Sequence, residues 1–211
     1  CEDALMAHNP DGRPLIGSLV RLDPTQAKDE TALVEALDDP RVFALGFAGG
    51  ASDRAAAIGR LIAGAGESRS MYTIRLASDT GFGAAGEGVG TTSLGDLEPT
   101  ACRAHAGWTA YRPDLWGKGL NAEVKLLLLG HAFEDCGFER VKLQTDSINE
   151  RSQKAIARLG AVREGVLRHH QPRADGSWRD TVVFSILSTE WPAVRTGLET
   201  RLQATLRSVN A

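Results

Sequence analysis

The sequence has few cysteines, no long apolar run and no dense basic segment. Its three cysteines, Cys1, Cys102 and Cys136, lack paired or metal-ligating spacing, so we expect reduced thiols in a cytoplasm and no metal site. The run Leu126–Leu129 is far too short to cross a membrane. The N-terminal residues show no basic-then-apolar signal-peptide pattern, and the start at Cys1 suggests that the sequence begins inside the natural protein. No basic segment is dense enough to indicate DNA binding.

What the sequence does contain is the composition of an ordinary globular domain. At 42% hydrophobic and 24% charged residues, a chain of 211 residues can bury a sizeable core. It has no internal repeat and no long linker. We therefore expect an N-terminal extension over residues 1–14 and a single domain over 15–211 that includes a C-terminal helix.

Charge is unevenly distributed along the chain. Residues 1–99 carry 8 Lys+Arg and 15 Asp+Glu, a net charge of −7, while residues 100–211 carry 16 and 12, a net charge of +4. An anionic ligand would prefer the second half and a cationic one the first. An uneven distribution of charged surface residues without any functional role would explain the same charge difference.

Hydrophobic periodicity predicts an α/β chain in which strands and helices alternate. Strands are expected over residues 15–24, 71–78, 88–97, 104–112, 140–145, 161–172 and 178–187. Helices are expected over 25–40, 52–66, 121–137, 147–160 and from 189 to about 207. Ser52 is the predicted cap of the second helix, and Ser147 with Glu150 has capping-box spacing. Because hairpins and helical crossovers both occur, the sheet should be mixed, with helices on both faces.

The stretch YRPDLWGKGLNAE (111–123) places two glycines directly before the most apolar helix. Glycine is a poor helix former, so the pair needs a reason. The N-terminus of a helix carries unpaired N–H groups and partial positive charge, which suit a phosphate. The pattern matches neither the P-loop nor the dinucleotide fingerprint. Taken alone, it supports a phosphate site and a simple helix-start loop equally.

Several short motifs together resemble the GNAT superfamily of acyl-CoA N-acyltransferases. They are WGKG (116–119), NERS (149–152), LGA (159–161) and EG (164–165). The resemblance is dense over about residues 104–192 and thinner over 15–100. Within the superfamily, the chain looks most similar to the RimJ/RimL type of ribosomal-protein N-terminal acetyltransferases. A GNAT fold and acetyl-CoA as co-substrate are what this resemblance implies.

The resemblance also implies which residues hold the cofactor. The loop that would cradle the pyrophosphate consists of Trp116, Gly117, Lys118 and Gly119. The strand that would pair with the pantetheine arm contributes Trp108, Thr109 and Ala110, and it would splay away from strand 140–145. Asn149 matches a family residue that hydrogen-bonds the pantetheine region.

Two departures from the family pattern are visible. Asp114 stands where the family often has Gln or Arg, which puts an anion near a proposed polyphosphate. Arg112 or Lys118 can offset that charge. Ile156 stands where many members have a tyrosine that protonates the departing thiolate. In the RimL-like branch a serine is proposed for that task, and Ser152 is its counterpart in this chain.

The general base is the least determined part of the site. His105 lies on the strand beside the loop and has a suitable intrinsic pKa. Glu87, Asp96 and Glu98 near the adjoining hairpin are alternatives, as is a chain of waters without a dedicated base. The adjacent His169 and His170 point to opposite faces of a strand, which argues against a shared metal ion.

We therefore expect an N-acetyltransferase in which a primary amine attacks acetyl-CoA directly in a ternary complex. The acceptor is a protein or peptide α-amino group, or a small-molecule amine. The family often forms homodimers, and no membrane partner is expected. The first alternative is a non-catalytic CoA-binding or sensing module on the same fold. The second is a structural α/β protein without a cofactor.

Overall fold

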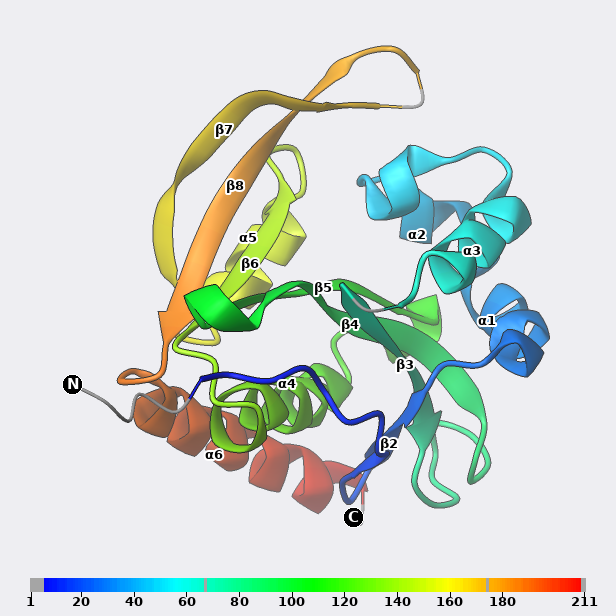
Figure 1. The fold of residues 1–211 in the computed structure, drawn as a ribbon. Helices are drawn as coiled ribbons and strands as arrows, with labels where there is room; N and C mark the ends of the chain where they lie inside the picture. The colour runs from blue at the N-terminus through cyan, green and yellow to red at the C-terminus, as the bar shows by residue number, and fades with distance from the viewer. Residues whose placement is uncertain (1–5, 67, 174, 210–211) are drawn as a thin grey trace.

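The computed structural model describes residues 6–66, 68–173 and 175–209 (Figure 1). Its strands are β1 (Leu15–Ile16), β2 (Val20–Pro24), β3 (Arg69–Leu76), β4 (Gly88–Glu98), β5 (Arg103–Tyr111), β6 (Arg140–Asp146), β7 (Val162–Pro172) and β8 (Trp178–Leu187). Its α-helices are α1 (Glu30–Leu37), α2 (Pro40–Phe43), α3 (Arg54–Ala63), α4 (Leu120–Gly130), α5 (Glu150–Ala157) and α6 (Trp191–Val209). No helix in these ranges is both long enough and apolar enough to cross a membrane.

The strands form one sheet in the order β1-β2-β3-β4-β5-β6-β8-β7. All neighbouring pairs are antiparallel except β5 and β6, which run parallel and are connected through α4. The predicted hairpins β3–β4 and β7–β8 are both present. The expected mixed, mostly antiparallel sheet is therefore confirmed.

The parallel strands β5 and β6 separate soon after they begin. They pair only over Arg103–His105 and Arg140–Lys142. Farther along, the register of β5 against β4 shifts between Gly107 and Ala110, and Trp108 adopts a φ of 49°. A β-bulge of this kind inserts an unpaired residue and bends the strand. The two strands diverge toward their C-terminal ends, which confirms the predicted splay.

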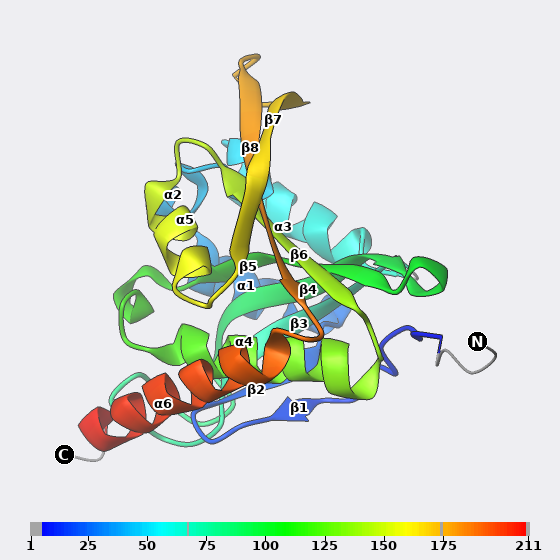
Figure 2. The same cartoon turned by 90° about the vertical axis from the view of Figure 1, so that its left-hand side faces the viewer.

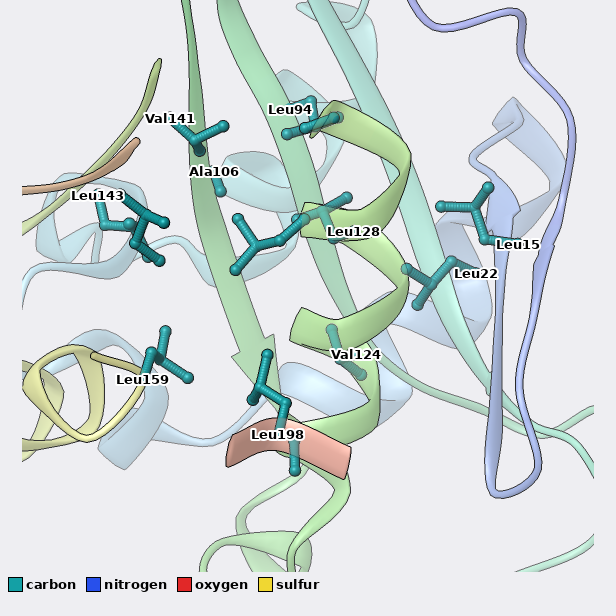
Figure 3. Close-up of a cluster of buried hydrophobic side chains, with 14 of the residues drawn as sticks. Leu15, Leu22, Leu94, Ala106, Val124, Leu128, Val141, Leu143, Leu159 and Leu198 are labelled. Atoms are coloured by element: carbon teal, nitrogen blue, oxygen red, sulfur yellow. The ribbon is translucent and has the colours of Figure 1, made fainter. Parts of the chain in front are cut away.

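Two hydrophobic clusters hold helices on opposite faces of the sheet (Figures 1 and 2). The larger cluster lies under α4 and α6, and Figure 3 shows Val124 and Leu128 of α4 with Leu198 of α6 in it. Each of these buried side chains contributes about 1.5 to 3 kcal/mol of hydrophobic stabilisation. The smaller cluster packs α1, α2 and α3 against Met71 of β3 and Ala110 of β5.

The first strand prediction was wrong in one respect, because residues 15–24 form two strands. β1 and β2 pair as a tight antiparallel hairpin. The buried carboxylate of Glu123 in α4 accepts N–H bonds from Ser18, Leu19 and Val20 at 2.6, 2.7 and 2.8 Å. These bonds fix the turn. The alternating sequence pattern of residues 15–24 could not predict this turn, because it depends on Glu123, about 100 residues away in the chain.

Two predicted helix caps were also wrong by one or two residues. The Asp53 side chain, rather than Ser52, accepts the N–H of Ala56 at the start of α3. At α5 the cap is Asn149, which accepts the N–H of Ser152 at 3.0 Å, so the predicted Ser147 capping box does not form. Both true caps have short side-chain oxygens that reach an unpaired N–H of the first turn.

Candidate active site

A cavity of about 890 Å³ opens where β5 and β6 diverge. Its walls come from β5, β6, the start of α4, α5, the loop after α2 and the C-terminal half of α6. Nearly all of the predicted site residues line it, namely His105, Trp108, Thr109, Ala110, Trp116, Gly117, Gly119, Asn149 and Ser152. Lys118 instead lines a second, more open hollow beside Phe82 and α6.

The glycine loop ends in a helix start that presents free backbone donors. Gly117 and Gly119 have φ angles of 77° and 89°, which glycine adopts without strain. The N–H groups of Gly119, Leu120 and Asn121 have no acceptor among the described residues. Such donors, together with the helix dipole of α4, give this end of the cavity a positive character that suits an anion.

The two glycines are constrained by different surroundings. A Cβ on Gly117 would meet nothing within 4 Å, so this position faces open space at the cavity. A Cβ on Gly119 would lie 2.1 Å from Oγ1 of Thr205 in α6. Gly119 is therefore required by its packing against α6, whereas Gly117 is constrained by its positive φ alone.

Asp114, the departure from the family pattern, is paired within its own loop. Its carboxylate accepts from Nε of Arg112 at 2.7 Å, and it is not among the cavity residues. Arg112 also bonds Glu87 and the carbonyl of Phe82. Hydrogen bonds to Asp114 and Glu87 raise the pKa of Arg112 despite partial burial. Asp114 is thus neutralised by Arg112, which leaves that arginine committed to local partners.

Trp116 is flanked by two arginines. Neither was a predicted site residue, although Arg151 belongs to the motif NERS. The guanidinium carbon of Arg151 lies 3.8 Å from the centre of the indole ring, and that of Arg41 lies 5.8 Å away. The indole N–H donates to the carbonyl of Tyr111 at 3.0 Å. Cation–π contact holds Arg151 at the cavity wall beside the helix start, where it adds positive charge.

Lys125 is a second cavity residue that sequence reasoning missed. It lies in the second turn of α4, is 6% exposed, and donates to Oγ1 of Thr109 at 2.8 Å. Burial lowers its pKa from 10.5 to about 8. The available signal was a lysine between Val124 and Leu128 on a helix that is otherwise apolar at these positions.

His105 is buried at the narrow end of the cavity. Its Nδ1 lies 3.3 Å from a carboxylate oxygen of Asp96, which also pairs with Lys142 at 2.7 Å. Its Nε2 has no hydrogen-bond partner among the described residues and lies against Gly107. Burial lowers the pKa of His105, and the nearby Asp96 carboxylate opposes that effect only in part. The ring is therefore neutral at pH 7.

Of the other base candidates, Asp96 contacts the cavity only through His105. Glu87 pairs with Arg112, and Glu98 pairs with Arg103 at 2.6 Å on the surface. None of the three carboxylates lines the cavity. His169 stacks on Trp178 and His170 contacts Thr181, so the two adjacent histidines have separate neighbours.

The start of α5 brings Asn149 and Ser152 to the cavity wall. The side chain of Asn149 caps the helix and donates to the carbonyl of Leu45 at 3.3 Å, so it ties α5 to the loop after α2. Ser152 is half-buried, and its hydroxyl has no partner among the described residues. Ile156 lies one turn farther along and is buried in the same wall. The tyrosine position of the wider superfamily is thus an apolar contact here.

The site thus combines three features: a parallel pair of strands that diverge, a helix start at the opening between them, and a bulge in β5. The model of the acetyltransferase (GNAT) domain matches residues 20–162. The chain belongs to the GNAT acetyltransferase domain family.

Known proteins similar to this chain support that assignment. The solved structure of a proposed acetyltransferase from T. thermophilus is 37% identical, with a TM-score of 0.79, and the match covers 92% of this chain and 100% of that one. RimJ of Mycobacterium smegmatis, solved in complex with CoA-disulfide, is 20% identical with a TM-score of 0.69 over 92% of this chain and 94% of its own, so it shows the fold alone. The uncharacterized N-acetyltransferase p20 of Bacillus licheniformis is 29% identical over 50% of this chain and 58% of its own length. This chain spans about half the length of the curated relatives it matches.

Proposed function

We propose that this protein is an acetyl-CoA-dependent N-acetyltransferase of the RimJ/RimL-like branch that acetylates a primary amine by direct attack in a ternary complex. The acceptor is a protein or peptide α-amino group or a small-molecule amine. The observation that carries the proposal is the cavity between β5 and β6, with the free N–H groups of α4 at its outer end. The solved RimJ of M. smegmatis, which shares the fold, was in complex with CoA-disulfide.

The residues of the cavity fit acetyl-CoA at both ends. The open space at Gly117 and the unpaired donors at the start of α4 suit a pyrophosphate. Arg151 and the exposed Lys118 add positive charge near this end. The diverging edge of β5 at Trp108, Thr109 and Ala110 offers backbone groups to the pantetheine arm, and Asn149 lies opposite. When bound, the cofactor supplies an acetyl group activated as a thioester.

His105 is the proposed general base. Because burial lowers its pKa, the ring is neutral near pH 7 and its free Nε2 can accept a proton from the acceptor ammonium. The Asp96 carboxylate lies 3.3 Å from Nδ1, and its charge favours the tautomer with the hydrogen on Nδ1, which leaves Nε2 as the accepting atom.

Two further groups complete the proposed chemistry. A backbone N–H of the bulged segment 108–110 donates to the oxygen on which negative charge develops. The hydroxyl of Ser152, which has no other partner among the described residues, donates a proton to the departing sulfur. Lys125, whose pKa is about 8, holds a second proton on the same cavity wall.

Thermal stability with and without ligand tests cofactor binding. At about 100 times the dissociation constant, CoA or acetyl-CoA stabilises by about 2.7 kcal/mol, which is a rise in Tm of roughly 5–10 °C. Gly117→Val should abolish this rise because its side chain fills the open approach to the loop. Gly86→Val is the matched control, since Gly86 has a φ of 78°, open space around it and no place in the cavity. A wild-type protein whose Tm does not respond to either ligand contradicts the proposal.

A thiol-release assay with a panel of amines separates catalysis from binding alone. Release of CoA that depends on an added primary amine supports the transferase. A protein that binds acetyl-CoA but releases no thiol with peptides or small amines is instead the CoA-binding module considered as the alternative.

A further inference from the structure

The cavity extends beyond the proposed cofactor contacts, to residues far from the glycine loop in the sequence. Here Leu45 and Gly46 of the loop after α2 line the cavity, as do Gln171 and Arg179 of the β7–β8 hairpin, which projects beyond the rest of the sheet (Figure 1). The proposed cofactor contacts lie on α4, β5 and α5. This part of the cavity is therefore left for the amine acceptor.

Arg179 on β8 is a cation that lines this part of the cavity and makes no ion pair with Asp146, the carboxylate whose charge acts on it. Its Nε is buried and has no hydrogen-bond partner, and the described residues make no hydrogen bond or ion pair with any part of the side chain. The nearby carboxylate of Asp146 is already engaged by Arg173, through bonds of 3.0 and 2.8 Å. A buried donor without a partner costs free energy, so its retention needs an explanation.

Gln144 offers a second unmatched group on the same face of the sheet. Its Oε1 is buried without a partner among the described residues. Gln144 and Asp146 are two apart on β6 and pair with Val183 and Thr181 of β8. Arg179 is two residues before Thr181, so side-chain alternation puts it on this face as well. One face thus presents an unpaired guanidinium and an unpaired amide to the cavity.

We propose that Arg179 and Gln144 form an acceptor subsite that binds a carboxylate, so that the acceptor is a primary amine carrying a nearby carboxylate. The planar guanidinium donates in parallel to both carboxylate oxygens, and the Gln144 amide bonds a polar group beside the amine. Asp146 does not oppose this binding, because Arg173 neutralises it. A free amino acid and a peptide whose first residue is acidic both supply this chemistry. The subsite rests on the proposed transferase function.

Matched acceptors test the subsite by thiol release. One set is alanine, alaninamide and ethylamine, and a second is phenylalanine, phenylalaninamide and phenethylamine. A third compares short peptides that differ only in beginning with Asp or Asn. We expect kcat/KM for carboxylate-bearing members to exceed that for their neutral counterparts by about ten- to a hundredfold. If the subsite binds the α-carboxylate of a free amino acid, alanine and phenylalanine should have the highest kcat/KM. If it binds the side chain of an acidic first residue, the Asp peptide should have the highest kcat/KM.

Variants assign the preference to Arg179. In Arg179→Gln the KM for the preferred carboxylate should rise about ten- to a hundredfold, whereas the KM for acetyl-CoA and for neutral amines stays unchanged. Arg179→Lys should restore part of the loss. Arg168→Gln is the control, because Arg168 is exposed on the same hairpin and does not line the cavity. Unchanged carboxylate preference in Arg179→Gln, or an equal loss for every amine and for acetyl-CoA, overturns the subsite.

A binding measurement keeps the two proposals apart. N-acetylalanine and N-acetylalaninamide are titrated calorimetrically into the CoA-saturated protein. Tighter binding of the acid that is lost in Arg179→Gln supports the subsite even where no amine is turned over. Equal or absent binding of the acid in wild type and variant, with CoA still bound, overturns the subsite alone. Absence of CoA binding contradicts the proposed function itself.

Discussion

At the scale of single residues, Lys125 holds a positive charge inside the protein with one hydroxyl as its partner. Burial lowers its pKa to about 8, and Thr109 is the group to which it donates. Burial also lowers the pKa of His105, and the charge of Lys125 adds to that effect. Such a lysine destabilises the fold at neutral pH, because its protonated form is better solvated in the unfolded chain. Its position is explained by the cavity it faces.

We expect Lys125→Met to stabilise the fold and to impair the enzyme's activity at low pH. The lowered pKa corresponds to roughly 3 kcal/mol at most, so the free energy of unfolding at pH 7 should rise by roughly 1–3 kcal/mol in urea titrations. Without this charge the pKa of His105 rises, and the acid limb of the kcat/KM profile moves to higher pH. Lys154→Met, on the exposed face of α5, is the control. A less stable Lys125→Met protein would mean that the lysine serves the fold.

At the scale of elements, α4 connects the site to the edge of the sheet. Its first turn presents the unpaired N–H groups that we propose bind the pyrophosphate, and its Glu123 binds the turn between β1 and β2 through three N–H groups. Glu123 is 2% exposed, so these bonds are shielded from water. One helix therefore positions the proposed phosphate site and secures the β1–β2 hairpin.

Glu123→Gln should reduce the free energy of unfolding by about 2 to 4 kcal/mol. The amide loses the charge that strengthens three N–H bonds, and its NH₂ group faces backbone donors instead of accepting from them. Chemical denaturation should show a lower midpoint with an unchanged m-value. Glu35→Gln is the control, because Glu35 is exposed on the surface of α1, and this variant should leave the midpoint unchanged. Equal midpoints for the Glu123 variant and wild type would remove this contact from the account of the fold.

Local patterns predicted the elements well where neighbours in sequence decide the structure. The hairpin β3–β4, the helix α4 and the glycine loop follow from periodicity and turn residues. Contacts between distant segments were not readable. The break at residues 17–19 depends on Glu123, and Lys125 is identified as a cavity residue only when β5 lies beside it. The neutralisation of Asp114 was anticipated through Arg112, but Arg179 gave no local signal.

At the scale of the whole molecule, the sheet consists of two parts that meet at a short parallel contact. β1 to β5 form one part and β6, β8 and β7 the other, and only Arg103–His105 and Arg140–Lys142 pair across the contact. Past that contact, the helices and the hydrophobic cluster that packs α4, α5 and α6 hold the parts together. A ligand that fills the opening would touch both parts.

Hydrogen exchange should therefore localise the effect of CoA. At short labelling times, CoA should slow exchange in segments 105–111, 117–121 and 143–152, which line the opening. Segments 20–24 and 69–76, which belong to fully paired strands, should change little. The measurement is mass spectrometry of peptides with and without CoA. Equal slowing in all segments would show that CoA acts on global unfolding rather than at this opening.

The bulge at Trp108 has a consequence for how the protein tolerates change. Gly95 lies so close to the indole that a Cβ there would be 2.6 Å from its ring, and Gly107 lies so close to His105 that a Cβ there would be 2.7 Å from Nε2. The bend that opens the sheet is thus fixed by two residues with no side chain. Substitutions at these glycines would propagate directly into the width of the opening. The activity should therefore be as sensitive to substitution of these glycines as to substitution of the reactive residues of the site.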